Sequence, residues 1–372
     1  MNHHPPVYLD WNATAPLRAC AREAWLHTQD VAWGNPASVH RTGQLARAML
    51  DAALASCAAS LGCHADELVV TSGGSEGLAS VLRAADGPVV ASVIDHSAVL
   101  RNAVSPRLVA VDVTGRIDPG ALAEAADGAA LVCIQAANNE TGTQQDVAAL
   151  AAAVRARNAT ARILVDACQV IGKAGLVLSA LGVDAVVIAG HKFGAPKGVG
   201  LLWLRRGVRL SPLIAGGRQQ SDRRSGTEDA ALAAALAAAL AEASTEAFSE
   251  GPRQAALIAD CWARLSTGLP QLRRLGGGLP NTLGLVHPGV DGRHLAMRLD
   301  LAGFAISTGA ACMAGRGEPS HVARALCGED ALARSFIRVS IGRGTSAAEL
   351  DRFATACIAA VGALTGAGSA TG

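Results

Sequence analysis

The sequence has 372 residues, enough for a large domain and a smaller one, each with its own hydrophobic core. Its 32 basic and 31 acidic residues give a formal charge of +1, which argues against a partner such as nucleic acid or an anionic membrane. The longest uninterrupted apolar stretch, residues 230–241, is too short to cross a bilayer, and no secretory signal is visible. We therefore expect no membrane span and a cytoplasmic location.

Between about residues 68 and 204, short apolar runs alternate with alanine-rich helical stretches. This alternation is typical of βα units that form a mainly parallel sheet. The expected strands are 68–71, 89–93, 108–111, 130–135, 162–166, 185–189 and 200–204. In such sheets ligands bind beyond the carboxyl ends of the strands, so polar residues at those ends are the candidate site.

The second half of the chain is expected to begin with a long helix over residues 229–246, which residues 249–252 end with a glycine and a proline. We place a domain boundary there. The large domain is predicted to comprise residues 14–250, and a smaller α+β domain to comprise residues 1–13 and 251–372. Strands are expected at 282–286 and 336–340, and a disordered tail at about 365–372.

Nine cysteines are scattered along the chain, and no pair has the CxxC spacing of a zinc or thioredoxin-type site. We expect reduced thiols, most of them small core residues. Cys312 is the exception, because the glycine-containing sequence around it, residues 307–317, predicts a mobile and exposed loop. No metal site is predicted with certainty, although Cys312 could transiently ligate an iron–sulfur cluster.

Lys192 is one of only three lysines, and it directly follows the apolar run 183–191. A primary amine just past the end of a buried strand can be desolvated and can form a Schiff base with an aldehyde cofactor, which arginine cannot do. The alternative is that Lys192 is an ordinary surface lysine in an arginine-rich chain.

Other polar groups follow neighbouring strands. The loop 72–77 leads from a strand into a helix and could hold a phosphate with backbone N–H groups, or it could be a simple turn. Asp166 ends a strand and could pair with a protonated ring nitrogen, or cap a helix. His96 could stack on a planar ring or move protons, or be a packed histidine. Asn139 could donate to a ring hydroxyl, or turn the chain.

The order of these groups along the chain describes a pyridoxal phosphate site. In this order of groups, the chain resembles the cysteine desulfurases of the NifS and IscS type, within the class V aminotransferase family. The matching segments are residues 8–16, 34–38, 71–76, 95–99, 138–142, 165–169, 190–192, 224–227 and 318–322. The resemblance covers residues 8 to about 344 and implies an α/β fold of the PLP-dependent transferase class, aspartate aminotransferase-like (fold type I). That fold has a mainly parallel seven-stranded sheet in its large domain and a smaller α+β domain.

Carried onto this sequence, the resemblance makes Lys192 the residue that binds the cofactor covalently. Asp166 would lie at the pyridine nitrogen and His96 on the face of the ring. Asn139 and Gln169 would address the ring hydroxyl.

The resemblance also implies a phosphate site. Gly74, Ser75 and His191 would bind the phosphate, and Thr227 would reach it from the other subunit, which implies a homodimer. Ala189 departs from the family pattern, because a serine usually precedes the Gly-His-Lys motif.

For the reaction, the resemblance implies that L-cysteine is converted to L-alanine. Asn35 and Arg338 match the positions expected to hold the substrate carboxylate, and a planar guanidinium can bind both of its oxygens. Cys312 would attack the substrate sulfur and keep it as a persulfide for a sulfur-acceptor protein, such as an iron–sulfur scaffold or another carrier.

Three other functions stay open. The protein could be a selenocysteine lyase or a class V aminotransferase in which Cys312 is incidental. It could also be a degenerate dimeric scaffold without enzymatic activity, although Lys192, Asp166 and His96 are all present. The residues after Cys312, 313–317, lack the serine-rich character usual in the family, which leaves the choice of acceptor open.

Overall fold

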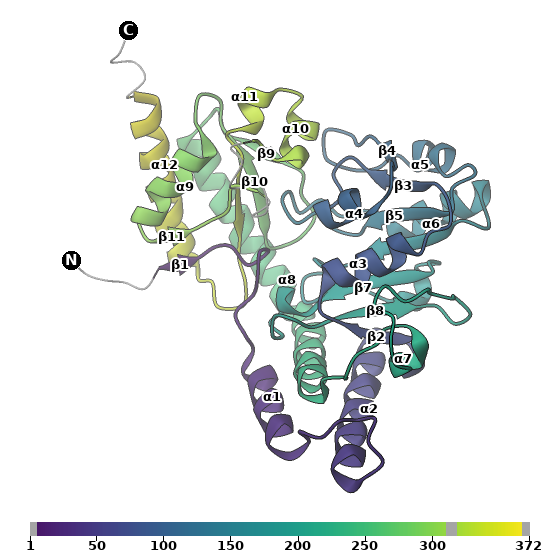
Figure 1. Cartoon of the computed structure of the whole chain (residues 1–372). Coiled ribbons are helices and arrows are strands. Elements are labelled where there is room, and N and C mark those ends of the chain that lie inside the picture. Colours follow the sequence, from purple (N-terminus) through teal and green to yellow (C-terminus); the bar gives the residue numbers. More distant parts are fainter. Residues whose placement is uncertain (1–5, 310–317, 367–372) are drawn as a thin grey trace.

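The computed structural model describes residues 6–309 and 318–366 (Figure 1). Cys312 and most of the expected loop 307–317 lie outside the described residues. Two lobes are visible in Figure 1, one built around a large sheet and one around a small sheet, with the helix α8 (Ala230–Gly268) running between them.

The large lobe contains a seven-stranded sheet with the strand order β2-β8-β7-β6-β5-β3-β4. Its strands are β2 (Leu68–Thr71), β3 (Val89–Ser92), β4 (Arg107–Val109), β5 (Leu131–Gln135), β6 (Arg162–Asp166), β7 (Ala185–Ala189) and β8 (Gly200–Leu204). The predicted ranges of β2, β6, β7 and β8 are confirmed to the residue; those of β3 and β5 differ by one residue at one end, and that of β4 differs by one or two residues at both ends.

Most neighbouring strands of this sheet are parallel, as predicted. The pairs β4-β3, β3-β5, β5-β6 and β6-β7 are parallel, and only β8 runs antiparallel to its neighbours β7 and β2. Since β2 and β7 are both antiparallel to β8, they point the same way. The loop after β2 therefore lies at the same sheet edge as the residues after β7.

Alternate residues of the strands enter two hydrophobic cores, one on each face of the sheet. On β6, Ile163 and Val165 belong to one core, and Leu164 belongs to the other. The helices of this lobe besides α8 are α1 (Ala19–Val31), α2 (Arg41–Leu61), α3 (Gly74–Arg83), α4 (Ser97–Asn102), α5 (Pro119–Ala125), α6 (Val147–Arg157) and α7 (Gln219–Asp222). The first core contains residues of α2, α6 and α8, and the second contains residues of α3 and α4.

The small lobe has its own core, which includes Phe353, Leu285 and Ile258. Its strands β9 (Arg273–Leu275), β10 (Thr282–Val286) and β12 (Ile337–Ser340) form an antiparallel sheet, and β1 (Val7–Tyr8) pairs with β11 (Phe304–Ala305). Its helices are α9 (Gly292–Leu301), α10 (His321–Cys327), α11 (Asp330–Ala333) and α12 (Ala347–Gly366). The expected disorder from residue 365 is wrong for Thr365 and Gly366, which end α12, and residues 367–372 are outside the described part.

The expected helix end at residues 249–252 is also wrong, because α8 continues through Pro252 to Gly268. A proline inside a helix removes one backbone hydrogen bond and costs about 3 kcal/mol. Each large side chain that α8 buries contributes about 1.5–3 kcal/mol. The helix buries Leu236 and Leu240 in the first core and Ile258 and Leu265 in the small-lobe core, so this burial outweighs the proline. The domain boundary at residue 250 stays a prediction.

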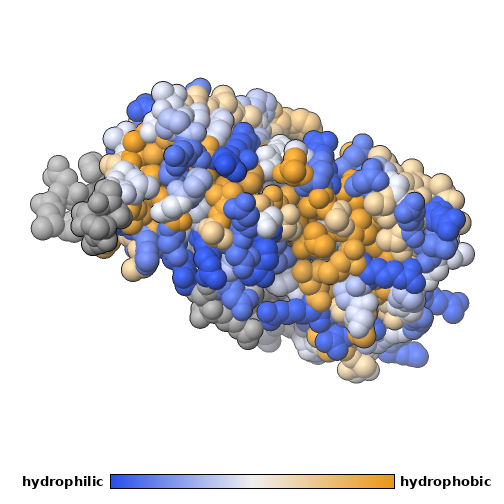
Figure 2. All heavy atoms as spheres, turned by 90° about the horizontal axis from the view of Figure 1, so that it is seen from above, coloured by the Kyte–Doolittle hydropathy of each residue, from blue (hydrophilic) through white to orange (hydrophobic). Residues whose placement is uncertain are grey.

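By length and composition alone, α8 is the one helix of the described residues that could cross a membrane, a property that it shares with core helices. It packs against α1 and α2. The surface seen from above the view of Figure 1 mixes polar and apolar residues, and its broadest apolar area lies on the half that carries the seven-stranded sheet (Figure 2).

Candidate active site

A cavity of about 230 Å³ opens at the carboxyl ends of the parallel strands. Every residue predicted to bind the cofactor, apart from Thr227, lines it: Gly74, Ser75, His96, Asn139, Asp166, Gln169, His191 and Lys192. Leu78, Gln135, Cys168 and Ala189 complete the lining. These residues come from five separate stretches of the chain, and the strand directions of the sheet bring them to one edge.

Lys192 lies in a single 3-10 turn directly after β7. Its Nζ donates to two backbone carbonyls of the N-terminal segment, Asn12 O at 2.7 Å and Ala13 O at 3.0 Å. Burial, and to a smaller extent the charge of Arg338, lowers the pKa of this amine, while Cys168 and Asp166 act in the opposite direction. The amine is therefore held in place and its neutral, nucleophilic form is more accessible than in free lysine.

Asp166 and His96 line the same cavity as Lys192. Asp166 is buried at the end of β6, and its Oδ1 accepts from the backbone N–H of Cys168 at 3.0 Å. His96 caps α4, where its Nδ1 accepts from Ala98 N at 3.1 Å. Burial lowers the pKa of His96, and the acceptor role of Nδ1 places the proton of the neutral ring on Nε2. The cavity thus contains a carboxylate and a neutral imidazole that can donate.

The loop between β2 and α3 has the geometry of an anion site. A Cβ at position 74 would come within 2.7 Å of the Cys168 sulfur, so any larger residue here would force the Cys168 side chain to shift. The first N–H groups of α3 have no partner within the helix and carry its positive dipole end. Glu76 holds the loop, because its Oε2 accepts from Ser72 N at 2.7 Å.

His191 lies beside this loop in the cavity. Its Nδ1 is 3.2 Å from Thr14 Oγ1. Burial lowers the pKa of His191 to about 4, with smaller contributions from the charges of Lys192 and Lys197. The ring is neutral near pH 7 and can act as a hydrogen-bond donor to a phosphate oxygen.

Asn12 connects the side chains around Lys192. Its carbonyl oxygen accepts from Lys192 and from Gln169 Nε2 at 2.9 Å. Its Nδ2 donates to Asn139 O at 3.2 Å, and its backbone N–H donates to Ser340 Oγ at 3.0 Å. This fully buried residue joins the N-terminal segment, the large lobe and the small lobe at the back of the cavity.

Three predicted residues do not line the cavity. Thr227 and Asn35 are exposed, and the Asn35 side chain accepts from the backbone N–H of Ala37. Arg338 is 2% exposed; it donates to Asn139 O at 2.9 Å and forms an ion pair with Asp10. Its Nε has no partner among the described residues. The roles proposed for these three residues stay predictions, and Cys312 lies outside the described residues.

Sequence reasoning missed Asn12, Cys168 and Lys173 as residues of the site. Cys168 and Asn12 lie within motifs that were used for the family resemblance, so their neighbourhood could have indicated them. Lys173 is one of three lysines and follows the Asp166 motif by seven positions, but no local pattern marks it. In residues 6–309 and 318–366 no cluster of three metal-ligating side chains occurs.

The sheet topology and the cavity define an enzyme of the fold type I class. The chain belongs to the aminotransferase class-V family, whose sequence pattern it matches over residues 7–353. It is 38% identical over 369 residues to a cysteine desulfurase of Cereibacter sphaeroides, with 93% of each chain covered. It is 33% identical to the cysteine desulfurase IscS of Dictyoglomus turgidum, covering 93% of this chain and 92% of the relative.

A solved structure named NifS-like protein is also similar, with a TM-score of 0.87 and 29% identity, covering 96% of this chain and 99% of that one. The predicted fold class and the resemblance to the NifS and IscS type of cysteine desulfurase are thereby confirmed.

The residues of the cavity fit pyridoxal phosphate. They offer an amine for the aldehyde, a carboxylate for the ring nitrogen, an imidazole for the ring face and a glycine-containing helix start for the phosphate.

Proposed function

We propose that the protein is a pyridoxal phosphate-dependent cysteine desulfurase. The observation that carries the proposal is the Lys192 amine, which shares one cavity with Asp166 and His96 and is held by two carbonyls of the N-terminal segment. L-Cysteine and the Cys312 thiol would react to give L-alanine and a Cys312 persulfide, so that one sulfur atom moves and no external oxidant is needed. The names of the relatives support this reaction.

Lys192 would hold the cofactor, with Asp166 at its ring nitrogen and Gly74, Ser75 and His191 at its phosphate. When bound, pyridoxal phosphate supplies an aldehyde for an amine and a ring that withdraws electrons from the substrate carbon. A carboxylate at this position would favour a protonated ring nitrogen. Asn139 and Gln169, which also line the cavity, would address the ring hydroxyl.

Lys192 and His96 are two groups that can move protons in the cavity. The lowered pKa of Lys192 makes its neutral amine a suitable base for the Cα proton of the substrate. The Nε2–H of neutral His96 is a suitable donor near the ring face. Both side chains are held by backbone groups, which fixes where a proton is taken up or given.

The residues on either side of the Cys312 segment are anchored next to the cavity. Ser307 forms a bridge with Arg338, and its Oγ donates to Gly309 O at 2.7 Å. On the other side, Ser320 bonds Glu140 at 2.5 Å and His321 Nε2 lies 2.9 Å from Asp95 O. Cys312 is three residues from Gly309, a reach of about 10 Å in an extended chain. This supports Cys312 as the thiol that attacks the substrate sulfur.

The proposal extends to partners and location. We also propose a homodimer. Thr227 is exposed on the large lobe, so it is available to reach the cofactor phosphate of a second subunit. The persulfide would pass to a sulfur-acceptor protein. The eight described cysteines are all free thiols, which supports a reducing, cytoplasmic environment.

The test compares Lys192→Ala with Lys197→Ala, an exposed lysine five residues away. After addition of pyridoxal phosphate and borohydride, the wild type and Lys197→Ala should carry the cofactor mass on the peptide with Lys192, and Lys192→Ala should not. With L-cysteine, wild type should release alanine and gain 32 Da on Cys312, whereas Cys312→Ser should keep the cofactor and form neither product. Alanine release by Cys312→Ser would refute the assigned role of the thiol.

A further inference from the structure

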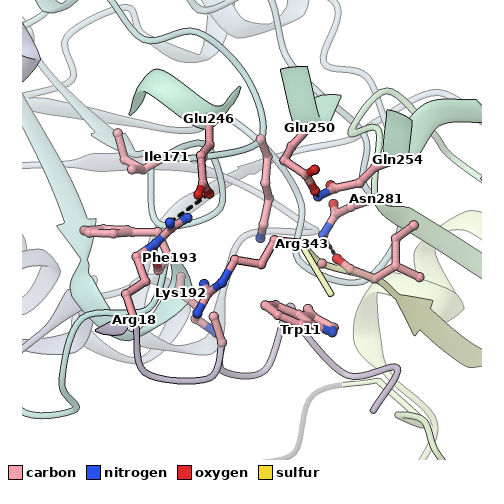
Figure 3. A pocket seen from close by; sticks show the side chains of 15 residues that line it. Trp11, Arg18, Ile171, Lys192, Phe193, Glu246, Glu250, Gln254, Asn281 and Arg343 are labelled. Atoms are coloured by element: carbon pink, nitrogen blue, oxygen red, sulfur yellow. Dashed lines mark hydrogen bonds and ion pairs between the residues drawn. The ribbon is translucent and has the colours of Figure 1, made fainter. Parts of the chain in front are cut away.

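Lys192 lines a second, smaller cavity of about 40 Å³ between the two lobes (Figure 3). Figure 3 labels Lys192, Glu246, Glu250 and Arg343 among the residues that line it; the two glutamates belong to α8, and the other two residues come from separate segments of the chain. Lys173 lines it as well. Lys173 does not line the cofactor cavity, and the reaction described above gives it no role.

The Lys173 amine is bonded to two residues near the Lys192 amine, Asn12 and Gln169. Its Nζ donates to Asn12 Oδ1 at 2.9 Å and to Gln169 Oε1. Asn12 in turn bonds Lys192 through its carbonyl oxygen. Lys173 is thus one residue removed from the Lys192 amine along a continuous hydrogen-bonded chain.

The contacts with Lys173 and with Asn12 O together set which way the Gln169 amide faces. The Lys173 amine donates to Gln169, so the Gln169 atom beside it is the carbonyl oxygen Oε1. The NH₂ group of Gln169 then points to Asn12 O, where the Nε2 to O distance is 2.9 Å. An amide NH₂ has two hydrogens, and because Gln169 lines the cofactor cavity, the second one is available there.

We propose that Lys173 is a positioning residue: through Asn12 and Gln169 it holds the Lys192 amine and turns the Gln169 amide so that it donates into the cofactor cavity. The proposal rests on the proposed function, because a donor from Gln169 suits the ring oxygen of pyridoxal phosphate. It can also be tested without the cofactor, through the bond between the Lys192 amine and Asn12 O.

Charged groups from several elements surround the two amines. Burial, together with the charges of Lys192 and Arg338, lowers the pKa of Lys173 well below its usual range. The two lysines therefore disfavour each other's protonation. The other charged groups that face the pair are Asp10 on the N-terminal segment, Asp166 at the end of β6, Arg18 before α1, Glu246 and Glu250 on α8, and Arg343 after β12.

Three variants separate the two effects of Lys173. Lys173→Met removes both donor and charge and keeps the length of the chain. Lys173→Gln keeps a neutral donor, and Lys173→Arg keeps both a donor and a positive charge. Thermal unfolding of each cofactor-free variant checks that it folds.

The first readout is the reactivity of Lys192 in the cofactor-free protein. Labelling with trinitrobenzenesulfonate across pH, measured on the Lys192 peptide with Lys197 as internal reference, gives the pH midpoint of the amine. We expect the midpoint to rise by about one unit in Lys173→Met and Lys173→Gln, a tenfold loss of reactivity at pH 7.5, and to stay within 0.3 units in Lys173→Arg. An unchanged midpoint in Lys173→Met overturns the role at Lys192.

The second readout is the preference for pyridoxal phosphate over 3-deoxypyridoxal phosphate, which lacks the ring oxygen. The wild type, Lys173→Gln and Lys173→Arg should bind the parent compound about tenfold more tightly. Lys173→Met should lose this preference, and a retained preference overturns the orientation of Gln169 by Lys173. If no variant and no wild-type protein bound either compound, the proposed function would fail, while the labelling experiment would still test the contact with Lys192.

Discussion

The Glu76 carboxylate pairs with the Arg224 guanidinium, with Nε and Oε1 2.9 Å apart across 148 residues of sequence. The same carboxylate accepts from Ser72 N in the loop before α3. Glu76 is 8% exposed as a side chain, and interactions with Arg224 and Ser72 together outweigh burial to lower its pKa. The pair therefore joins the proposed phosphate loop to the segment that carries Thr227.

Replacing Arg224 should weaken binding of the cofactor phosphate. In Arg224→Gln the loop loses its anchor, and a cost of about 1.4 kcal/mol corresponds to a tenfold lower affinity. Titration with pyridoxal phosphate should show this loss, and titration with pyridoxal, which has no phosphate, should not. Arg264→Gln, which removes an exposed ion pair with Asp351, is the control and should bind both compounds like wild type.

Asp166→Asn should slow the reaction and leave the cofactor bound. A hydrogen bond to a charged group contributes about 1.5–3 kcal/mol, which corresponds to a fall in rate of at least tenfold. Alanine production from L-cysteine measures the rate, and absorbance measures bound cofactor. Asp118→Asn, which changes only an exposed helix cap, is the control. A variant rate equal to that of wild type would contradict the role of Asp166 at the ring nitrogen.

Asp95→Asn should stabilise the protein at neutral and alkaline pH. Burial raises the pKa of Asp95 to about 7, and its Oδ1 has no partner among the described residues. Between the unfolded value near 4 and pH 7, the folded state binds the extra proton, so wild-type stability should fall as pH rises through this window. The gain of the variant should grow from pH 4.5 to pH 7 and then stay level, reaching at most about 4 kcal/mol.

Thermal unfolding of both proteins at pH 4.5, 7 and 8.5 measures this difference. A gain that is the same at all three pH values would show that ionisation of Asp95 does not limit stability.

Pro252→Ala should stabilise α8. Alanine supplies the N–H that proline lacks, which can donate to the carbonyl oxygen of Phe248 one turn earlier. Because Phe248 is exposed and this turn is partly solvated, we expect the free energy of unfolding to rise by about 1 kcal/mol. Pro252→Gly restores the same N–H but should gain less, since glycine is about 1 kcal/mol less favourable than alanine inside a helix. Denaturant unfolding of the three proteins measures the order, and a destabilised Pro252→Ala would contradict it.

The sheet and most of the cavity could be predicted because both depend on local patterns. Buried parallel strands are short apolar runs, and each polar motif lies at the end of one of them or within a few residues after it, as Asp166 does at the end of β6. The end of α8 could not be predicted, because Pro252 is a local signal whereas the burial of Ile258 and Leu265 depends on a distant core. Lys173 could not be assigned, since its partner Asn12 is 161 residues away.

The bond between Asn12 N and Ser340 Oγ joins positions 328 residues apart. During synthesis on the ribosome, the segment that holds Lys192 must wait for β12, among the last elements to emerge. The amine can reach its native surroundings only when nearly the whole polypeptide has been translated. A nascent chain stalled before residue 340 should therefore acquire its sheet well before it can retain vitamin B6.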